Sequence, residues 1–253
     1  MESQQPKILI VVPCYNEQTR FDLIYWKNVI SSNPFVRFVF VNDGSSDETL
    51  RIIQEIGQAS EVLSLEKNSG KSEAIRLGWL QYISESKWIG YGFIDSDGAF
   101  SPNDIQKLIE IFKVQFDSNS KVDVILSSRV ALAGRKIERT PFRHYLGRII
   151  ATYISHNWPG SPYDTQSGFK LFIKTDCFRK AILEPFETRW FFDIELLVRL
   201  KSLKEIELRI WEEPLMSWKE IANSKIKKYE FLRILREIFI VKTIVRESVR
   251  LSK

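Results

Sequence analysis

Residues 7–13 read KILIVVP, and this apolar run predicts a buried β-strand. Four more β-rich runs follow, at 37–42 (RFVFVN), 61–65 (EVLSL), 88–94 (WIGYGFI) and 122–127 (VDVILS). Each is separated from the next by a segment long enough to form a helix. Strands that alternate with helices in this way indicate a parallel sheet covered by helices. The expected fold class is therefore α/β, with a mostly parallel central sheet and flanking helices.

Two of the intervening segments carry helix-start signals. Ser46 and Asp47 precede a predicted helix over 48–56, and Ser101 and Pro102 precede another over 103–116. Beyond about residue 130 the alternation weakens, yet no linker, repeat or low-complexity block divides the chain. The second half is therefore expected to extend the same domain.

The composition indicates a globular protein. The chain has 253 residues, of which 44% are hydrophobic, and a net charge of +5. This excludes intrinsic disorder, and two cysteines are too few for a disulfide framework, which favours a reducing compartment. The apolar runs are far shorter than the roughly 20 residues that cross a bilayer. The first seven residues, MESQQPK, have no signal-peptide pattern. Neither export nor a membrane span is expected.

The positive charge is concentrated near the C-terminus. Ten basic residues stand against four acidic ones between Lys219 and Lys253. In the same segment apolar residues recur at helical spacing: Phe231, Ile234, Ile238, Val241, Val245 and Val249. Such a stripe either docks on the protein's own core or contacts an anionic membrane surface. We expect a main domain over 1–225 and an amphipathic helical extension over 226–253.

Polar motifs follow three of the predicted strands, at 13–17 (PCYNE), 42–47 (NDGSSD) and 95–98 (DSDG). An open parallel sheet binds its ligand at the carboxyl ends of its strands, where these motifs fall. Asp95 and Asp97 lie on one turn and suit Mg²⁺ or Mn²⁺, ions that commonly share their ligands with a substrate phosphate. An isolated Asp-x-Asp is also ordinary turn chemistry, so this motif is informative only together with the others.

Residues 68–72 (NSGKS) look like part of a phosphate-binding P-loop. That motif requires a first glycine at position 65, which is Leu65, so a P-loop nucleotidase is excluded. A Gly-Lys pair at the start of a helix still suits a phosphate, through backbone N–H groups and the ammonium. Taken together, the motifs predict a nucleoside diphosphate ligand.

These motifs, in this order and spacing, resemble those of family 2 glycosyltransferases of the GT-A fold. Further motifs at 128–129 (SR), 164–172 (DTQSGFKLF), 189–197 (RWFFDIELL) and 217–225 (SWKEIANSK) resemble the dolichyl-phosphate β-glucosyltransferases and the polyprenyl-phosphate mannosyltransferases. The resemblance extends from about residue 7 to about 246. It implies a single GT-A domain that transfers a hexose with inversion, most simply glucose from UDP-glucose, with GDP-mannose as the other donor. The implied acceptor is a polyprenyl or dolichyl phosphate, reached from the cytoplasmic face of a membrane by a peripheral protein.

The resemblance also implies roles for individual residues of the donor site. It places Pro13, Tyr15 and Glu17 around the nucleoside and Asp43 at the base. Gly70 and Lys71 would lie near the nucleotide. Asp97 would bind Mg²⁺ or Mn²⁺, and Asp95 would face the sugar and the same metal. Ser224 and Lys225 match a loop expected to fold over the donor.

For the acceptor, the resemblance places Arg129 and Arg143 at the phosphate, whose geometry suits a guanidinium. Gly147 stands where the mannosyltransferases have a serine, so that contact is missing. Asp164 and Asp193 are the candidate catalytic carboxylates, as general base or organiser of the acceptor. A phosphomonoester has a second pKa near 6 and is largely a dianion at neutral pH, so it needs orientation more than deprotonation. A purely structural role explains each residue equally well: Asp164 could be a turn residue and Asp193 could cap the N-terminus of a helix.

Two other functions remain open from the sequence. One is a soluble family 2 transferase that acts on a saccharide or protein hydroxyl, which would depend on a general base such as Asp193. The other is an inactive module that binds a nucleotide sugar or a membrane surface, which Mn²⁺-enhanced nucleotide binding would distinguish. Nucleic acid is not an expected partner.

Overall fold

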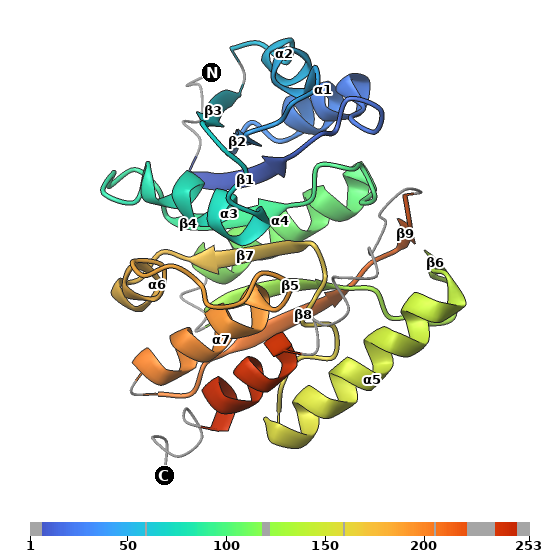
Figure 1. Cartoon of the computed structure of the whole chain (residues 1–253), viewed down its shortest axis with the longest axis vertical. Helices are drawn as coiled ribbons and strands as arrows, with labels where there is room; N and C mark the ends of the chain where they lie inside the picture. The colour runs from blue at the N-terminus through green and yellow to red at the C-terminus, as the bar shows by residue number, and fades with distance from the viewer. Residues whose placement is uncertain are drawn as a thin grey trace.

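A computed structural model describes residues 7–58, 60–117, 122–158, 160–204, 206–221 and 236–246. Its centre is a seven-stranded sheet in the order β3-β2-β1-β4-β7-β5-β8 (Figure 1). These strands are β1 (Ile8–Cys14), β2 (Val36–Asp43), β3 (Glu61–Leu65), β4 (Gly90–Ile94), β5 (Val124–Ser128), β7 (Phe169–Ile173) and β8 (Ile210–Pro214). A small second sheet pairs β6 (Lys136–Glu138) with β9 (Ser217–Lys219). The predicted α/β class with a mostly parallel sheet is confirmed, and all five predicted strands are present.

The helices are α1 (Leu23–Ser32), α2 (Thr49–Gln54), α3 (Lys71–Leu80), α4 (Pro102–Asp117), α5 (Pro141–Asn157), α6 (Asp176–Ala181) and α7 (Phe192–Leu203). Residues 236–246 form one more helical segment, here called the C-terminal helix. Both helices predicted from start signals are found, as α2 and α4. The first is shorter than expected, because the chain turns after Gln54.

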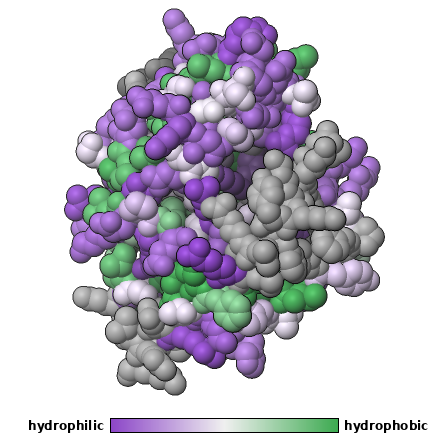
Figure 2. Space-filling model, viewed as in Figure 1, coloured by the Kyte–Doolittle hydropathy of each residue, from purple (hydrophilic) through white to green (hydrophobic). Residues whose placement is uncertain are grey.

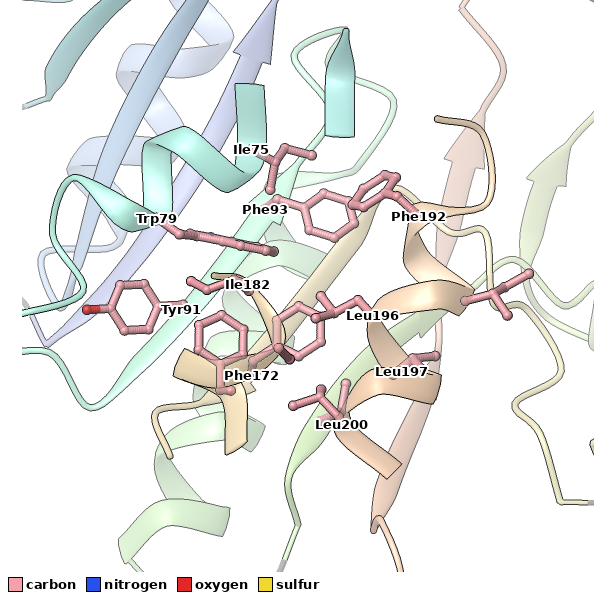
Figure 3. Packing of buried hydrophobic residues seen from close by; sticks show 14 of the residues in the cluster. Ile75, Trp79, Tyr91, Phe93, Phe172, Ile182, Phe192, Leu196, Leu197 and Leu200 are labelled. Carbon is pink, nitrogen blue, oxygen red and sulfur yellow. The ribbon is translucent and has the colours of Figure 1, made fainter. Parts of the chain in front are cut away.

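Two hydrophobic cores lie on opposite faces of the sheet, because side chains alternate along each strand. In β1, Leu9 and Val11 belong to one core, and Ile8, Ile10 and Val12 to the other. The first core is covered by α3, α6 and α7, and the second by α1, α2 and α4. Figure 3 shows the first core, where Trp79 of α3 and Phe172 of β7 meet with ring centroids 5.8 Å apart.

The C-terminal helix contributes to the first of these cores. Val241 and Val245, two residues of the predicted apolar stripe, are buried there, and Ile238 packs against it. Phe231, Ile234 and Val249 lie outside the described residues. Over residues 236–246 the stripe therefore docks on the protein's own core, while Phe239 on another side of the helix is 66% exposed. No helix in the described ranges is long and apolar enough to cross a membrane.

Strand β7 breaks the parallel pattern, since it pairs antiparallel with both β4 and β5. Its first residue, Phe169, therefore lies beside Ile94, the last residue of β4. The chain entering β7 thus reaches the edge at which β1, β2, β4 and β5 end. The polar motifs of both halves of the sequence are brought together at this one edge.

Candidate active site

A pocket of about 310 Å³ opens at this edge of the sheet. Its charged lining has two kinds of side chain. The carboxylates are Asp95, Asp97, Asp164, Asp193 and Glu220, and the cations are Lys71, Arg129, Arg139, Arg148 and Arg189. The four carboxylates that the sequence singled out as catalytic are thus all in one pocket, although they come from loops after β4, before β7 and at the start of α7.

The turn after β4 carries Asp95 and Asp97. Asp95 forms an ion pair with Lys71, with Oδ1 and Nζ 2.5 Å apart. Burial, and next the negative charge of Asp95, raise the pKa of Asp97 above its usual value. Gly168, just before β7, accepts a hydrogen bond from the backbone N–H of Asp95 at 3.0 Å. A Cβ at position 168 would lie 2.1 Å from Asp95 Oδ2, so only glycine allows this approach.

Lys71 is the first residue of α3, and Asp43 of β2 holds the turn that leads to it. The two carboxylate oxygens of Asp43 accept the backbone N–H groups of Ser69 and Gly70 at 2.7 and 2.8 Å. Gly70 has a φ of 93°, a conformation that favours glycine. Asp43 is buried, and burial raises its pKa against the lowering effect of these two hydrogen bonds. It was predicted to contact the base, and in the structure both of its oxygens are engaged by this turn.

The loop after β1 lies at the same edge but outside the lining of the pocket. Pro13 is the last residue but one of β1, Tyr15 is exposed, and Glu17 is buried. Glu17 Oε1 accepts a hydrogen bond from Arg20 at 2.5 Å. Its other oxygen, Oε2, is buried and has no hydrogen-bond partner among the described residues. A buried acceptor of this kind is costly unless a ligand satisfies it.

The segment after β5 carries Arg129, which forms a two-pronged ion pair with Asp164. Arg129 Nε and NH2 donate to the two carboxylate oxygens at 2.7 Å each, and the backbone N–H of Arg129 adds a third bond at 2.9 Å. Burial opposes ionisation of Asp164, but the charge and hydrogen bonds of Arg129 more than offset it and hold the pKa of that carboxyl well below its usual range. Neither residue is free to act alone.

Asp193 likewise has a cation of its own. It lies in the first turn of α7 and accepts a hydrogen bond from the fully buried Lys170 of β7, which also donates to the backbone carbonyl of Ser167 at 2.5 Å. Burial lowers the pKa of Lys170 despite the neighbouring carboxylate. We did not identify Lys170 from the sequence. Its signal was a single lysine inside the apolar strand run at 169–173.

A second residue missed in the sequence is Glu237 of the C-terminal helix. It is buried, and its Oε2 accepts the backbone N–H groups of Arg189 and Trp190 at 3.0 and 2.7 Å. Arg189 and Trp190 line the pocket. The C-terminal helix therefore anchors one wall of the candidate site. Nothing in the sequence pattern distinguished Glu237 from a solvated residue of an amphipathic helix.

Replacing Glu237 by alanine is expected to lower the free energy of unfolding by about 1–3 kcal/mol, because two backbone donors lose their acceptor. Glu237→Gln keeps an acceptor oxygen and should lose less. Urea unfolding measures both, and Arg236→Ala, at an exposed position on the same helix, is the matched control. An unchanged unfolding midpoint in Glu237→Ala would mean that this anchor contributes nothing.

For the remaining predicted site residues, the structure describes no side-chain contacts. Arg143 lies in α5, and its side chain is not described. Ser224 and Lys225 lie outside the described residues. In the described part of the chain, no three His, Cys, Asp or Glu side chains form a cluster that would hold a metal alone. Asp95 and Asp97 would therefore supply two carboxylates, a set that fits a cation sharing its ligands with a phosphate.

Comparisons with solved structures identify the same fold elsewhere. Glucosyl-3-phosphoglycerate synthase from Mycobacterium tuberculosis, in complex with Mn²⁺, UDP and phosphoglyceric acid, superposes with a TM-score of 0.65 over 93% of this chain and 77% of that chain. The sequences are 16% identical. At this identity the likeness shows the fold, and it confirms the expected GT-A architecture.

Sequence relatives are closer. A dolichyl-phosphate β-glucosyltransferase of Trichomonas vaginalis is 32% identical over 86% of this chain, and the match spans 65% of that protein's own length. The enzymes of the same name from Saccharomyces cerevisiae and Homo sapiens are 30% and 29% identical. These matches cover 92% and 89% of this chain, and 73% and 71% of the yeast and human proteins.

The family model "Glycosyl transferase family 2" matches residues 9–177. This range runs from β1 to α6 and includes the turns that carry Asp43, Asp95 and Asp97. Because the match covers most of the chain, and the motifs that suggested it meet at one pocket, this protein belongs to glycosyl transferase family 2.

Proposed function

We propose that this protein transfers glucose from UDP-glucose to a polyprenyl phosphate of the dolichyl type, with inversion at the anomeric carbon. The observation that carries the proposal is the way in which the charged side chains are distributed over the pocket lining. Two carboxylates and a lysine lie on the side of β4 and α3, and arginines lie on the side of β5 and α5. A donor diphosphate with its cation suits the first side, and an anionic acceptor suits the second. The names of the relatives support glucose and dolichyl phosphate.

The donor side suits a metal-bound nucleoside diphosphate. Asp97, supported by Asp95, would hold Mg²⁺ or Mn²⁺, and crystals of the structural neighbours contain these ions together with UDP. A bound divalent cation would neutralise the charge that grows on the leaving diphosphate. Lys71 lies beside Asp95 and would orient the same phosphates. Glu17 Oε2, the buried acceptor without a partner in the described structure, would receive a hydroxyl of the ribose.

The acceptor side favours a phosphate over a hydroxyl. A hydroxyl acceptor would need a free carboxylate as general base. Of the five pocket carboxylates, Asp95, Asp164 and Asp193 are each paired with a cation, namely Lys71, Arg129 and Lys170. Asp97 is assigned to the metal, and Glu220 accepts the backbone N–H of Thr140 at 3.0 Å. A phosphomonoester is already ionised at neutral pH and needs no base. The ion pairs therefore support a phosphate acceptor, with Asp164 and Asp193 organising cations around it.

A lipid acceptor would be met at a membrane surface. We place the protein on the cytoplasmic face as a peripheral protein, supported by the excess of basic residues after Lys219 and by apolar side chains that reach the surface. Figure 2 shows hydrophilic residues over most of the visible face, with hydrophobic groups scattered along its left side and across its lower half.

The test is a partition assay with purified protein, Mg²⁺ or Mn²⁺, radiolabelled UDP-glucose or GDP-mannose, and a short polyprenyl phosphate in detergent. We expect label to enter the organic phase with UDP-glucose. Label from GDP-mannose alone would overturn the choice of sugar. If water-soluble donor is consumed but no label enters the organic phase, the lipid acceptor is wrong. If neither donor is consumed and Mn²⁺ does not enhance nucleotide binding, the inactive binding module replaces the enzyme.

A further inference from the structure

The ion pairs of Asp95, Asp164 and Asp193 differ in how far solvent reaches them. In the pairs of Asp164 and Asp193, no side chain is more than 15% exposed. In the pair of Lys71 with Asp95, the two side chains are 40% and 34% exposed. Breaking a buried pair is costly, whereas an exposed pair contributes little to stability. The pair of Lys71 with Asp95 is therefore the one that a ligand separates most easily.

Lys71 occupies the carboxylate oxygen of Asp95 that a cation would use. Its ammonium lies 2.5 Å from Oδ1. The other oxygen, Oδ2, lies against Gly168, where a Cβ would be only 2.1 Å away. Mg²⁺ bound to Oδ1 at its usual distance of about 2.1 Å would stand within about 5 Å of the ammonium. At that distance the two positive charges repel each other.

Other side chains keep this ammonium in the pocket. The ring centroids of Phe93 in β4 and Phe192 in α7 lie 5.5 and 5.9 Å from Nζ. The negative charges of Asp97 and Asp193 also act on it. Aromatic faces attract a cation without fixing the direction of its N–H donors. The ammonium is therefore able to turn from Asp95 to another anion while it keeps these contacts.

We propose that Lys71 is an internal counter-ion that closes Asp95 to a free divalent cation until a nucleoside diphosphate draws the ammonium away. This inference rests on the proposed function and concerns the coupling between the donor and its cation. The ammonium moves from Asp95 to a phosphate oxygen, and the released Oδ1 joins Asp97 in holding the cation. Nucleotide and cation then strengthen each other's binding by the same factor.

A lysine that only contacted the donor phosphates would behave differently when removed. Nucleotide binding would weaken, and the affinity for the cation alone would stay the same. A counter-ion competes with that cation, so its removal strengthens the binding of the cation alone. Misfolding does not produce such a gain of affinity, which makes the gain a specific sign of the counter-ion.

The experiment measures Mn²⁺ binding to the whole protein without nucleotide, by electron paramagnetic resonance of the free ion. We expect Lys71→Met to bind Mn²⁺ about tenfold more tightly than wild type, a factor within the usual range for coupled sites. Lys71→Arg keeps the positive charge and should match wild type. Lys67→Met removes the same charge at an exposed position outside the pocket lining, and should also match wild type. Adding Asp95→Asn to Lys71→Met should abolish the gain.

The same titration with UDP measures the coupling. UDP should tighten Mn²⁺ binding by wild type at least about tenfold, and clearly less in Lys71→Met. No gain in Lys71→Met without nucleotide would overturn the proposal, as would an equal gain in Lys71→Arg or Lys67→Met. If wild type transfers no glucose in the partition assay but Lys71→Met shows the gain, the proposed reaction fails and the counter-ion stands. Glucose transfer without the gain would leave the reaction and remove the counter-ion.

Discussion

Replacing Asp97 by asparagine is expected to reduce the rate of glucose transfer about 10²–10³-fold while leaving the protein folded. An amide is a poor ligand for Mg²⁺ or Mn²⁺, so the diphosphate would leave without the charge neutralisation that these ions supply. The fold should tolerate the change, because Asp97 is a partly buried carboxylate close to a second one, Asp95. Removing one of two like charges lowers their repulsion.

Two measurements distinguish this expectation from a general defect. The first is the turnover number in the partition assay. The second is calorimetric binding of UDP with and without Mn²⁺, which should show Mn²⁺-enhanced affinity in wild type and none in Asp97→Asn. Asp22→Asn is the matched control, since Asp22 caps α1 outside the pocket and asparagine caps equally well. An Asp97→Asn protein that keeps a third or more of the wild-type turnover would exclude Asp97 as the metal ligand.

The sheet and its order of motifs were predictable because they depend on local patterns. β1 to β5 are short apolar runs flanked by turn residues, and the carboxyl ends of parallel strands necessarily share an edge. Asp95 and Lys71 could therefore be expected near one another without any knowledge of packing. Their ion pair in the structure agrees with that expectation.

The second half was less predictable, because its contacts join residues that are distant in the sequence. The direction of β7 has no local signature, yet it brings Gly168 against Asp95 and Lys170 against Asp193. The partners Arg129 and Asp164 are 35 residues apart. The sequence indicated both residues as separate candidates, Arg129 for the acceptor and Asp164 for catalysis. It could not reveal that the two side chains form an ion pair with each other.

The C-terminal stripe illustrates the same limit. Its spacing predicted one buried face but not what would cover it, and the protein core and a membrane were equally good partners. Val241 and Val245 are covered by the core, and Glu237 on the same helix reaches the pocket wall. Periodicity indicates that a helix has an apolar side, whereas only tertiary structure identifies the surface it meets.

Removing the carboxylate of Asp164 is expected to lower the free energy of unfolding by roughly 3–5 kcal/mol at neutral pH, because it leaves the buried guanidinium of Arg129 unpaired. The double variant Asp164→Ala with Arg129→Met should recover much of this loss, since no isolated charge remains. Urea unfolding of the two single variants and the double variant gives the coupling between the residues. Asp176→Ala provides the control, because Asp176 and Arg179 form an exposed pair at 4.0 Å that should contribute about 0–1 kcal/mol.

The pH dependence gives an independent check on this ion pair. The pKa of Asp164 is lower in the folded protein than its ordinary value of 3.8. A carboxyl with a depressed pKa stabilises the fold above its unfolded pKa, and that stabilisation is lost as the pH falls through the folded value. The difference in stability between wild type and Asp164→Asn should therefore be constant above about pH 5 and shrink below about pH 4. A difference that does not change with pH would mean that Asp164 contributes by packing alone.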